Sequence, residues 1–263
     1  MITSLQNTLV KEIVALRESK YRRIKGLTLI DGVREIQRAS QAGIGIEHLV
    51  YCEKLFTKRG EKELIVKAKE LNLPLLAVND KVFSKIAFGE RAEGVLAVAK
   101  TPQMTLAQFH VSKNPLLVVL ESVEKPGNLG AILRSCDGAG VEAVLVCDPK
   151  TDMFNPNVIR ASTGIVFSLP VIADTQENIA AFLVKAGVNV YLASPDGKCV
   201  YNTPDYRKPT AFVLGSEDKG LSQLWLTSKA SQINIPMSGK ADSLNVSVST
   251  ALLVYEALRQ RAS

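Results

Sequence analysis

Three segments of the sequence place glycines and polar residues where an apolar run ends. The first segment is KPGNLGAILRSCDGAG (125–140), which follows the apolar run PLLVVLESV (115–123). The other two, FVLGSEDKGLS (212–222) and INIPMSGKADSLNVS (233–247), each include the end of an apolar run and the residues after it. In an open parallel sheet, the loops at the carboxyl ends of the strands share one edge. The three segments are therefore predicted to converge on one site.

These glycine-containing loops do not match a phosphate-binding nucleotide site. A P-loop requires G-x-x-x-x-G-K-[ST], but GSEDKG (215–220) is followed by Leu221 and Ser222. A dinucleotide fingerprint requires G-x-G-x-x-G, which neither PGNLGAILR (126–134) nor GIGIEH (43–48) supplies. ATP, GTP and NAD are thus disfavoured. A nucleoside that carries a sulfonium, held by backbone groups and apolar walls, fits the loops better.

Residues suited to metal or thiol chemistry are scattered along the chain. The two histidines are isolated and the cysteines include no C-x-x-C pair; they are His48, His110, Cys52, Cys136, Cys147 and Cys199. Neither a metal site nor a disulfide is expected from this spacing. Cys136 and His48 are interpreted as packing residues without a chemical role.

Two α/β regions are predicted to position the loops. Residues 1–103 alternate strand-like and helix-like segments, which favours a small α/β sandwich. Residues 104–114 show neither the hydrophobic periodicity of a helix nor that of a strand and are interpreted as a linker. In residues 115–263 the strand-like runs are almost continuously apolar, which is typical of a mostly parallel sheet covered on both faces. SLNVSVSTALLVYEALRQRAS (243–263) is predicted to be a closing helix.

The charge of the chain is concentrated at its amino-terminal side. The net charge is +6, and residues 1–100 hold 18 Lys and Arg against 12 Asp and Glu, whereas the remainder holds 14 of each. The first helix is predicted from the apolar stripe Leu5, Leu9, Ile13 and Leu16, with Thr3 or Ser4 as its cap, and it ends in the basic stretch RESKYRRIKG (17–26). Nucleic acid is the expected partner of such a basic region; a merely solvated basic surface is the alternative.

Membrane and secretion signals are not evident. The purely apolar runs fall far short of the roughly 20 residues that span a bilayer, and the start MITSLQNTLVKE does not resemble a signal peptide. A cytoplasmic location is expected.

Together the three segments resemble the signature motifs of the SpoU (TrmH) family of RNA ribose 2′-O-methyltransferases. The resemblance covers about residues 115–263, and IRASTG (159–164) is similar to a further family stretch. The matching residues are Asn128, Gly130, Arg134 and Gly140 in the first motif, Leu214 to Glu217 with Gly220 and Leu221 in the second, and Ile235 to Met237, Ser243 to Ser247, Tyr255 and Glu256 in the third. Residues 1–103 resemble the ribosomal-protein-L30e-like RNA-binding module that many members carry.

The resemblance implies an α/β-knot catalytic domain (a deep trefoil) that binds S-adenosylmethionine and forms a homodimer with the active site near the subunit interface. It implies methylation of an RNA ribose 2′-hydroxyl, ribosomal RNA being favoured over the alternative, transfer RNA. A catalytically inactive RNA-binding protein of the same fold is the other alternative. Ser135 and Cys136 after the motif arginine, and Asp218 and Lys219 in the second motif, depart from the family pattern, which bears on substrate choice.

The resemblance also implies roles for particular residues. Arg134 is expected to stabilise the developing charge on the ribose oxygen, or to act as a base assisted by the substrate phosphate; a structural salt bridge is the alternative. The catalytic set is Arg134, Asn128, Glu217, Ser243 and Asn245. The cofactor-binding set is Leu214, Gly215, Ile235, Met237, Leu244 and Asn245. The residues expected to bind RNA are Arg17, Arg22, Arg23, Lys25 and Arg160.

Overall fold

The computed structural model describes residues 1–57, 59–88, 93–216 and 220–262. The chain divides into two compact units. The first unit consists of Met1–Gln103 together with Phe154–Ser168, and the second of Met104–Met153 together with Leu169–Ser263. The chain therefore leaves the second unit after β6 and returns to it before β7, so that a segment in the middle of the sequence belongs to the amino-terminal unit.

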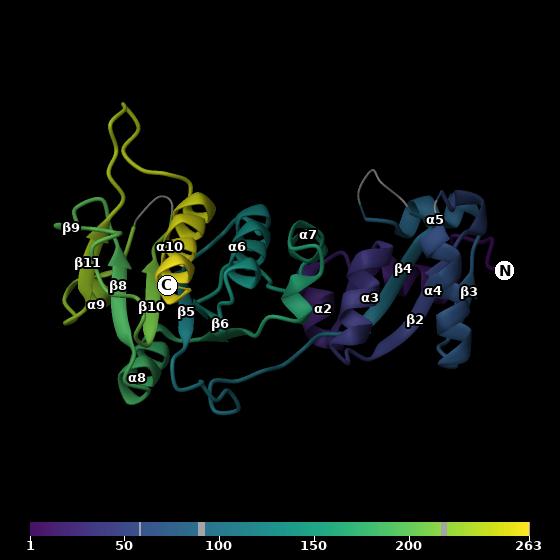
Figure 1. Ribbon diagram of the computed structural model, residues 1–263. Helices are drawn as coiled ribbons and strands as arrows, with labels where there is room; N and C mark the ends of the chain where they lie inside the picture. Colours follow the sequence, from purple (N-terminus) through teal and green to yellow (C-terminus); the bar gives the residue numbers. More distant parts are fainter. Residues whose placement is uncertain (58, 89–92, 217–219, 263) are drawn as a thin grey trace. The chain divides into compact units, whose positions relative to one another are not determined.

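The first unit is built on a four-stranded sheet of order β1-β4-β2-β3 (Figure 1). β4 runs antiparallel to both β1 and β2, whereas β2 and β3 are parallel. The strands are β1 (Leu27–Asp31), β2 (Ile46–Tyr51), β3 (Leu75–Ala77) and β4 (Val95–Lys100). The helices are α1 (Thr8–Ala15), α2 (Ser19–Lys25), α3 (Val33–Gln41), η1 (Glu53–Leu55), α4 (Arg59–Glu70), α5 (Asp80–Ile86), α7 (Pro156–Ala161) and η2 (Ile165–Phe167).

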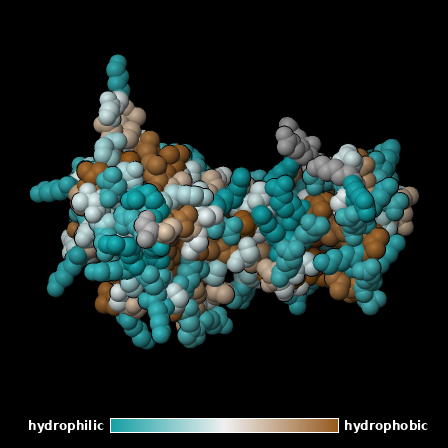
Figure 2. Space-filling view, viewed as in Figure 1, coloured by the Kyte–Doolittle hydropathy of each residue, from teal (hydrophilic) through white to brown (hydrophobic). Residues whose placement is uncertain are grey.

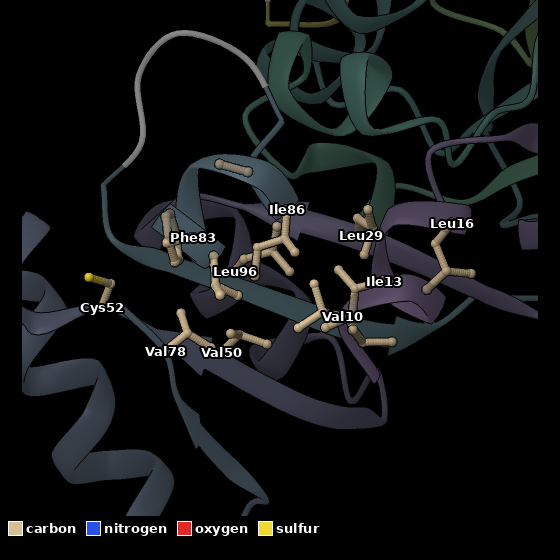
Figure 3. Close-up of a cluster of buried hydrophobic side chains, with 13 residues drawn as sticks. Val10, Ile13, Leu16, Leu29, Val50, Cys52, Val78, Phe83, Ile86 and Leu96 are labelled. Carbon is tan, nitrogen blue, oxygen red and sulfur yellow. The ribbon is translucent and has the colours of Figure 1, made fainter. Parts of the chain in front are cut away.

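The core of this unit lies between its sheet and helices α1 and α5. Figure 3 shows Val10 and Ile13 of α1 and Phe83 and Ile86 of α5 among the side chains gathered over the strands, together with Leu96 of β4. All five are buried. α5 was not predicted from the sequence, because it has less than two turns and is too short for a helical repeat to be evident.

The opening helix is shorter than predicted. It begins at Thr8 because the side chain of Asn7, rather than Thr3 or Ser4, accepts the Leu9 N–H at 3.0 Å. The basic stretch forms a separate helix, α2. The guanidinium of Arg22 donates to the carbonyls of Leu16 (2.8 Å) and Arg17 (2.7 Å), which supplies partners for carbonyls at the end of α1 and holds the break between the two helices.

Hydrogen bonds attach the returning segment Phe154–Ser168 to β1 and α3 of the first unit. The Thr28 hydroxyl of β1 donates to the Phe154 carbonyl at 2.6 Å. The Arg38 guanidinium of α3 donates to both the carbonyl and the hydroxyl of Thr163, each at 2.6 Å. The amino-terminal unit is thus completed by residues that follow it by more than fifty positions in the sequence.

The second unit is built on a seven-stranded sheet of order β7-β6-β5-β10-β8-β11-β9, and every pairing in it is parallel. This confirms the predicted parallel sheet. The strands are β5 (Leu116–Glu121), β6 (Ala143–Cys147), β7 (Val171–Asp174), β8 (Asn189–Ala193), β9 (Cys199–Val200), β10 (Thr210–Leu214) and β11 (Ser231–Asn234). The helices are α6 (Pro126–Gly138), α8 (Gln176–Lys185), α9 (Gln223–Leu226) and α10 (Val246–Arg261).

Helices cover both faces of this sheet, which explains why β5, β6 and β10 are buried throughout and, apart from Glu121 and Thr210, apolar at consecutive positions. α10 packs along α6 and contacts β5 and β10 (Figure 1). Ile179 and Leu183 of α8 and Trp225 of α9 belong to a core that includes Leu117 and Val119, alternate residues of β5.

The segment predicted as a linker, 104–114, contains no helix or strand. It is nevertheless attached to the second unit, since Leu106, Phe109 and Val111 pack against the core around α8. The rings of Phe109 and Phe182 have centroids 6.1 Å apart. Within the described ranges, no helix is long and apolar enough to cross a membrane.

Candidate active site

A cavity of about 500 Å³ opens in the second unit, where β8, β10 and β11 end. Loops from distant parts of the chain line it, as the rule for parallel sheets predicts. All the residues expected to bind a cofactor line this cavity: Leu214, Gly215, Ile235, Met237, Leu244 and Asn245. Ser243, expected to be catalytic, lines it as well.

The backbone after β10 approaches itself so closely that position 215 must be glycine. Ser216 and Gly220 exchange two backbone hydrogen bonds, of 3.1 and 3.0 Å. A Cβ atom added to Gly215 would lie 2.2 Å from the carbonyl carbon and oxygen of Gly220, and backbone cannot move aside as a flexible side chain can. This close approach forms one wall of the cavity. Glu217 lies outside the described residues.

A fourth loop contributes to the cavity and was missed by the sequence analysis. Ala193, Ser194 and Pro195, at the end of β8, line it. Gly197 holds this loop against β11: an added Cβ would lie 2.6 Å from the Ile233 carbonyl carbon. The signal was present, because S-P-D-G (194–197) is a turn sequence directly after an apolar run and therefore belongs to the same sheet edge.

The cavity suits a cationic ligand better than a phosphate. Its walls include aliphatic side chains such as Leu253 and Ile233, and Asp242 is the one charged side chain among the described lining residues. The loop that carries Asp242 leads from β11 to α10 and ends in a hydrophilic tip, seen at the upper left of Figure 2. Backbone edges, aliphatic walls and a single carboxylate fit an adenosine bearing a sulfonium, and the volume lies in the usual range of roughly 300–1,000 Å³ for small-molecule sites.

A smaller hollow of about 70 Å³ adjoins this cavity. The two share the lining residues Gly215, Ser216 and Val246. The remaining walls of the smaller hollow come from the loop between β5 and α6 and from the first turn of α6: Ser122, Val123, Glu124, Lys125 and Asn128. Of these, only Asn128 was singled out from the sequence. Lys125 and Ser122 were missed because they lack a motif of their own.

Asn245 joins the first turns of α10 and α6. Its Oδ1 atom caps α10 by accepting the Ser247 N–H (2.9 Å) and the Ser247 hydroxyl (2.6 Å). Its Nδ2 atom donates to Oδ1 of Asn128 at 3.3 Å. The first and third motifs are therefore in direct contact, at the boundary between the two hollows.

Arg134 occupies α6 six residues after Asn128, and its side chain is exposed. It lines neither hollow, and it has no hydrogen-bond or ion-pair partner in the described part of the chain. The alternative interpretation, a structural salt bridge, therefore finds no partner among these residues. An unpartnered cation on the helix that carries Asn128 is available to an external anion.

The residues expected to bind RNA have different environments, and one of these expectations is corrected by its burial. Arg22 is only 3% exposed and its guanidinium is used by the backbone at the α1–α2 break, so it is not available to phosphates. Arg17 donates to the Ala87 carbonyl and lies over the Phe88 ring. Arg160 is partly buried in the first unit and donates to the Phe88 carbonyl at 2.8 Å. Arg23 and Lys25 are exposed.

A buried carboxylate, Asp31, lies within the electrostatic reach of Arg160 in the first unit. Burial raises the pKa of Asp31 to about 6, although the Phe88 N–H (2.8 Å) and the positive charge of Arg160 both oppose the rise. The thiols have no comparable role: Cys136 is buried and desolvation raises its pKa far above the ordinary value. No group of His, Cys, Asp and Glu within the described residues could hold a metal ion.

Two family models match the chain. The model described as the SpoU rRNA methylase family matches residues 115–255, and the model described as an MRM3-like substrate binding domain matches residues 7–97. The chain belongs to the SpoU rRNA methylase family. The resemblance inferred from the three motifs is thereby confirmed.

Relatives and solved structures agree with this assignment over the whole chain. A 23S rRNA (uridine(2479)-2′-O)-methyltransferase of Streptomyces viridochromogenes is 32% identical, with 100% of this chain and 93% of the relative covered. The 23S rRNA (guanosine(2553)-2′-O)-methyltransferase RlmP of Bacillus subtilis (strain 168) is 29% identical, with 97% of both chains covered.

Among solved structures, an RNA 2′-O ribose methyltransferase has 41% identity and a TM-score of 0.88 over 100% of this SpoU-family chain and 99% of its own. An AdoMet-bound rRNA methyltransferase from Sinorhizobium meliloti has 31% identity and a TM-score of 0.89, with 100% and 98% covered. The predicted fold class, an α/β knot with a small amino-terminal α/β domain, is confirmed by these likenesses.

Proposed function

We propose that this SpoU-family protein methylates a ribose 2′-hydroxyl of ribosomal RNA, with S-adenosylmethionine as the methyl donor. The observation that carries the proposal is the pair of adjoining hollows that share Gly215, Ser216 and Val246. The larger has the size and lining for the cofactor. The smaller, beside Asn128 and Lys125, has room for part of a ribose at the boundary where a methyl group would be transferred.

S-adenosylmethionine, when bound, supplies an electrophilic methyl group. The residues of this chain have to orient the ribose and stabilise the negative charge that develops on its 2′-oxygen. Asn128 lies at the boundary between the hollows, and its Oδ1 is held by Asn245, so the carboxamide has a defined direction. Gly215 lines both hollows and has no side chain, so main chain rather than a side chain forms the wall that they share at this position.

Arg134 is assigned to the substrate phosphate next to the methylated ribose. It is exposed, it belongs to the same helix as Asn128, and no described residue neutralises it. A guanidinium bound to that phosphate increases the positive potential around the 2′-oxygen. Because a guanidinium is a poor base, charge stabilisation is the role we favour, and deprotonation assisted by the phosphate is the alternative.

Ribosomal RNA is favoured over transfer RNA as the substrate. The full-length relatives described above are named for 23S ribosomal RNA, and the resemblance to them includes the amino-terminal unit. We assign that unit to substrate binding. We keep residues 1–103 and 115–263 as the two domains predicted from the sequence, with the returning segment Phe154–Ser168 as a part of the second that completes the amino-terminal unit.

Methyl transfer from tritiated S-adenosylmethionine tests the proposal. Unmodified ribosomal RNA and transfer RNA are offered separately to the wild type and to Arg134→Ala, and label at an alkali-stable linkage identifies ribose methylation. Label is expected in ribosomal RNA with the wild type and to fall at least tenfold with Arg134→Ala. Arg207→Ala is the matched control, because Arg207 is also exposed in the second unit but is paired with Asp205 (2.8 Å).

The outcomes separate the alternatives. Label only in transfer RNA would identify the transfer RNA enzyme. Failure to label naked RNA or assembled particles, with cofactor binding intact, would indicate an inactive RNA-binding protein. Undiminished label with Arg134→Ala would remove Arg134 from the mechanism.

A homodimer through the second unit also belongs to the proposal. α10 exposes Val248 (47%), Leu252 (37%) and Tyr255 (49%) at spacings of four and three residues, so they lie on one side of the helix. A second copy of this surface would cover them. Leu252→Glu is expected to shift the molar mass in light scattering from dimer to monomer, and an unchanged mass would exclude this interface. The cytoplasm, where ribosomal RNA is found, is the location we assign.

A further inference from the structure

The short helix α2 has an unusual distribution of side chains. Its one buried side chain is an arginine, Arg22, at 3% exposure, whereas its apolar residues Tyr21 and Ile24 are 48% and 67% exposed. Folding would normally bury the tyrosine and isoleucine and expose the arginine. Here the guanidinium is required by the carbonyls at the end of α1, and the apolar side chains face outward as a consequence.

Cations surround the two apolar side chains. Lys20 and Lys25 are exposed. Lys20 lies four residues before Ile24, and Lys25 lies four residues after Tyr21. Because residues three and four apart are neighbours on a helix, the four side chains form one continuous surface. Arg23 is exposed at its edge. We define Lys20, Tyr21, Arg23, Ile24 and Lys25 as the α2 surface. None of its three cations has a side-chain partner in the described part of the chain, and α2 itself contains no acidic residue.

Another helix of the same unit provides a comparison. α4 also exposes an apolar residue, Val66 (55%), among lysines. That helix, however, alternates acids with its cations, and Arg59 is paired with Glu63 at 2.7 Å. Charge thus distinguishes the α2 surface, which is suited to a polyanion, from the surface of α4, which is not.

We infer that the α2 surface binds unpaired nucleotides of the RNA, with Tyr21 stacking on a nucleobase, Ile24 packing beside it and Lys20, Arg23 and Lys25 on the flanking phosphates. An RNA duplex hides its base faces in the helical stack, so an exposed aromatic side chain gains little from it. In a loop or bulge the base faces are accessible, and aromatic stacking is insensitive to base identity. The inference rests on the proposed function only in that RNA is the substrate.

Binding of fluorescent RNA to the full-length protein, measured by anisotropy, tests the inference. The probes are an unstructured oligoribonucleotide and the same strand annealed to its complement, each titrated over a range of salt concentrations. Tyr21→Ala is expected to weaken single-strand binding by about 5- to 140-fold, the usual effect of removing one stacked aromatic residue. Tyr21→Phe, which retains the ring, is expected to bind as the wild type does.

The salt dependence separates stacking from charge. Tyr21→Ala should leave the slope of log affinity against log salt unchanged, whereas Lys25→Ala should reduce it by about 0.7, one phosphate contact to a single strand. Val66→Ala is the matched control and should leave binding unchanged. Thermal unfolding of each variant verifies that α2 and its unit remain folded.

Three results would overturn the inference: single-strand affinity within twofold of wild type for Tyr21→Ala, an equal loss for duplex and single strand, or an equal loss with Val66→Ala. The methyl-transfer assay distinguishes this failure from failure of the proposed function. If the protein methylates RNA but Tyr21→Ala does not weaken binding, only the role of the α2 surface is refuted. If binding depends on Tyr21 but no methylation occurs, the proposed enzymatic function is refuted and the role of the α2 surface is retained.

Discussion

The carboxamides of Asn128 and Asn245 are joined by a hydrogen bond of 3.3 Å, although 117 residues separate them in the sequence. The contact connects the first turn of α6 with the N-cap of α10, and these two helices pack side by side. It also lies where the larger cavity and the smaller hollow meet, since Asn245 lines the first and Asn128 the second. The junction between the proposed cofactor and ribose sites is therefore held by two side chains.

Asn245→Asp should separate the two roles of this residue. An aspartate can still cap α10 by accepting the Ser247 N–H, but it cannot donate to Asn128. Thermal stability is expected to stay close to that of the wild type while methyl transfer falls. Asn245→Ala should lose both, with the missing cap costing about 1 kcal/mol of unfolding free energy. Equal activity of Asn245→Asp and wild type in the tritium assay would show that the contact does not position the ribose.

Gly215→Ala is expected to abolish cofactor binding. The added methyl group would lie 2.2 Å from the backbone of Gly220, so the wall of the cavity would have to move. Isothermal titration with S-adenosylmethionine should give no measurable heat. Gly239→Ala is the control, because a Cβ there has no atom within 4 Å and Gly239 does not line the cavity. Normal affinity in Gly215→Ala would place the cofactor elsewhere.

Arg38→Ala should loosen the returning segment Phe154–Ser168. The substitution removes both hydrogen bonds to Thr163 and is expected to cost about 1–3 kcal/mol locally. Hydrogen exchange followed by mass spectrometry should show faster exchange in peptides that cover α7 and η2. Arg34→Ala, an exposed position on the same helix, should leave exchange unchanged. If both variants exchange as the wild type does, the guanidinium does not hold the segment.

Asp31 should make the stability of the first unit depend on pH. The carboxyl has an ordinary pKa of 3.8 and a folded pKa of about 6, so between these values the folded chain retains a proton that the unfolded chain releases. The contribution of Asp31 to the free energy of unfolding is therefore fully present below about pH 4 and is lost as the pH rises through 6. The loss amounts to roughly 3 kcal/mol, at 1.36 kcal/mol per unit of pKa difference. Asp31→Asn should largely abolish this dependence in urea unfolding at pH 4.5 and 7.5.

The exposed Asp196 provides the control for that experiment. Asp196→Asn should show the same pH dependence as the wild type. If Asp31→Asn also did so, some other group would be responsible for the titration.

Much of the catalytic unit could be predicted from the sequence because parallel sheets translate simply into sequence patterns. Continuous apolar runs such as 116–120 and 211–214 are buried on both faces, and the residues after them must lie at one edge. The convergence of Gly215, Ile235 and Leu244 on one cavity followed from that rule and from the resemblance of the motifs. The S-P-D-G loop obeys the same rule and could have been included.

The amino-terminal unit was less predictable because its interactions are not local. That Arg22 is buried while Tyr21 is exposed depends on unsatisfied carbonyls at the end of α1, which a helical repeat cannot reveal. That Phe154–Ser168 completes this unit depends on hydrogen bonds from Thr28 and Arg38 across more than 120 positions. The sequence alone thus determined the family, the parallel sheet and the edge that holds the site. Tertiary structure decided which cations remain available to RNA. An arginine donates either to backbone carbonyls or to solvent, and which of these partners it has depends on how distant segments pack.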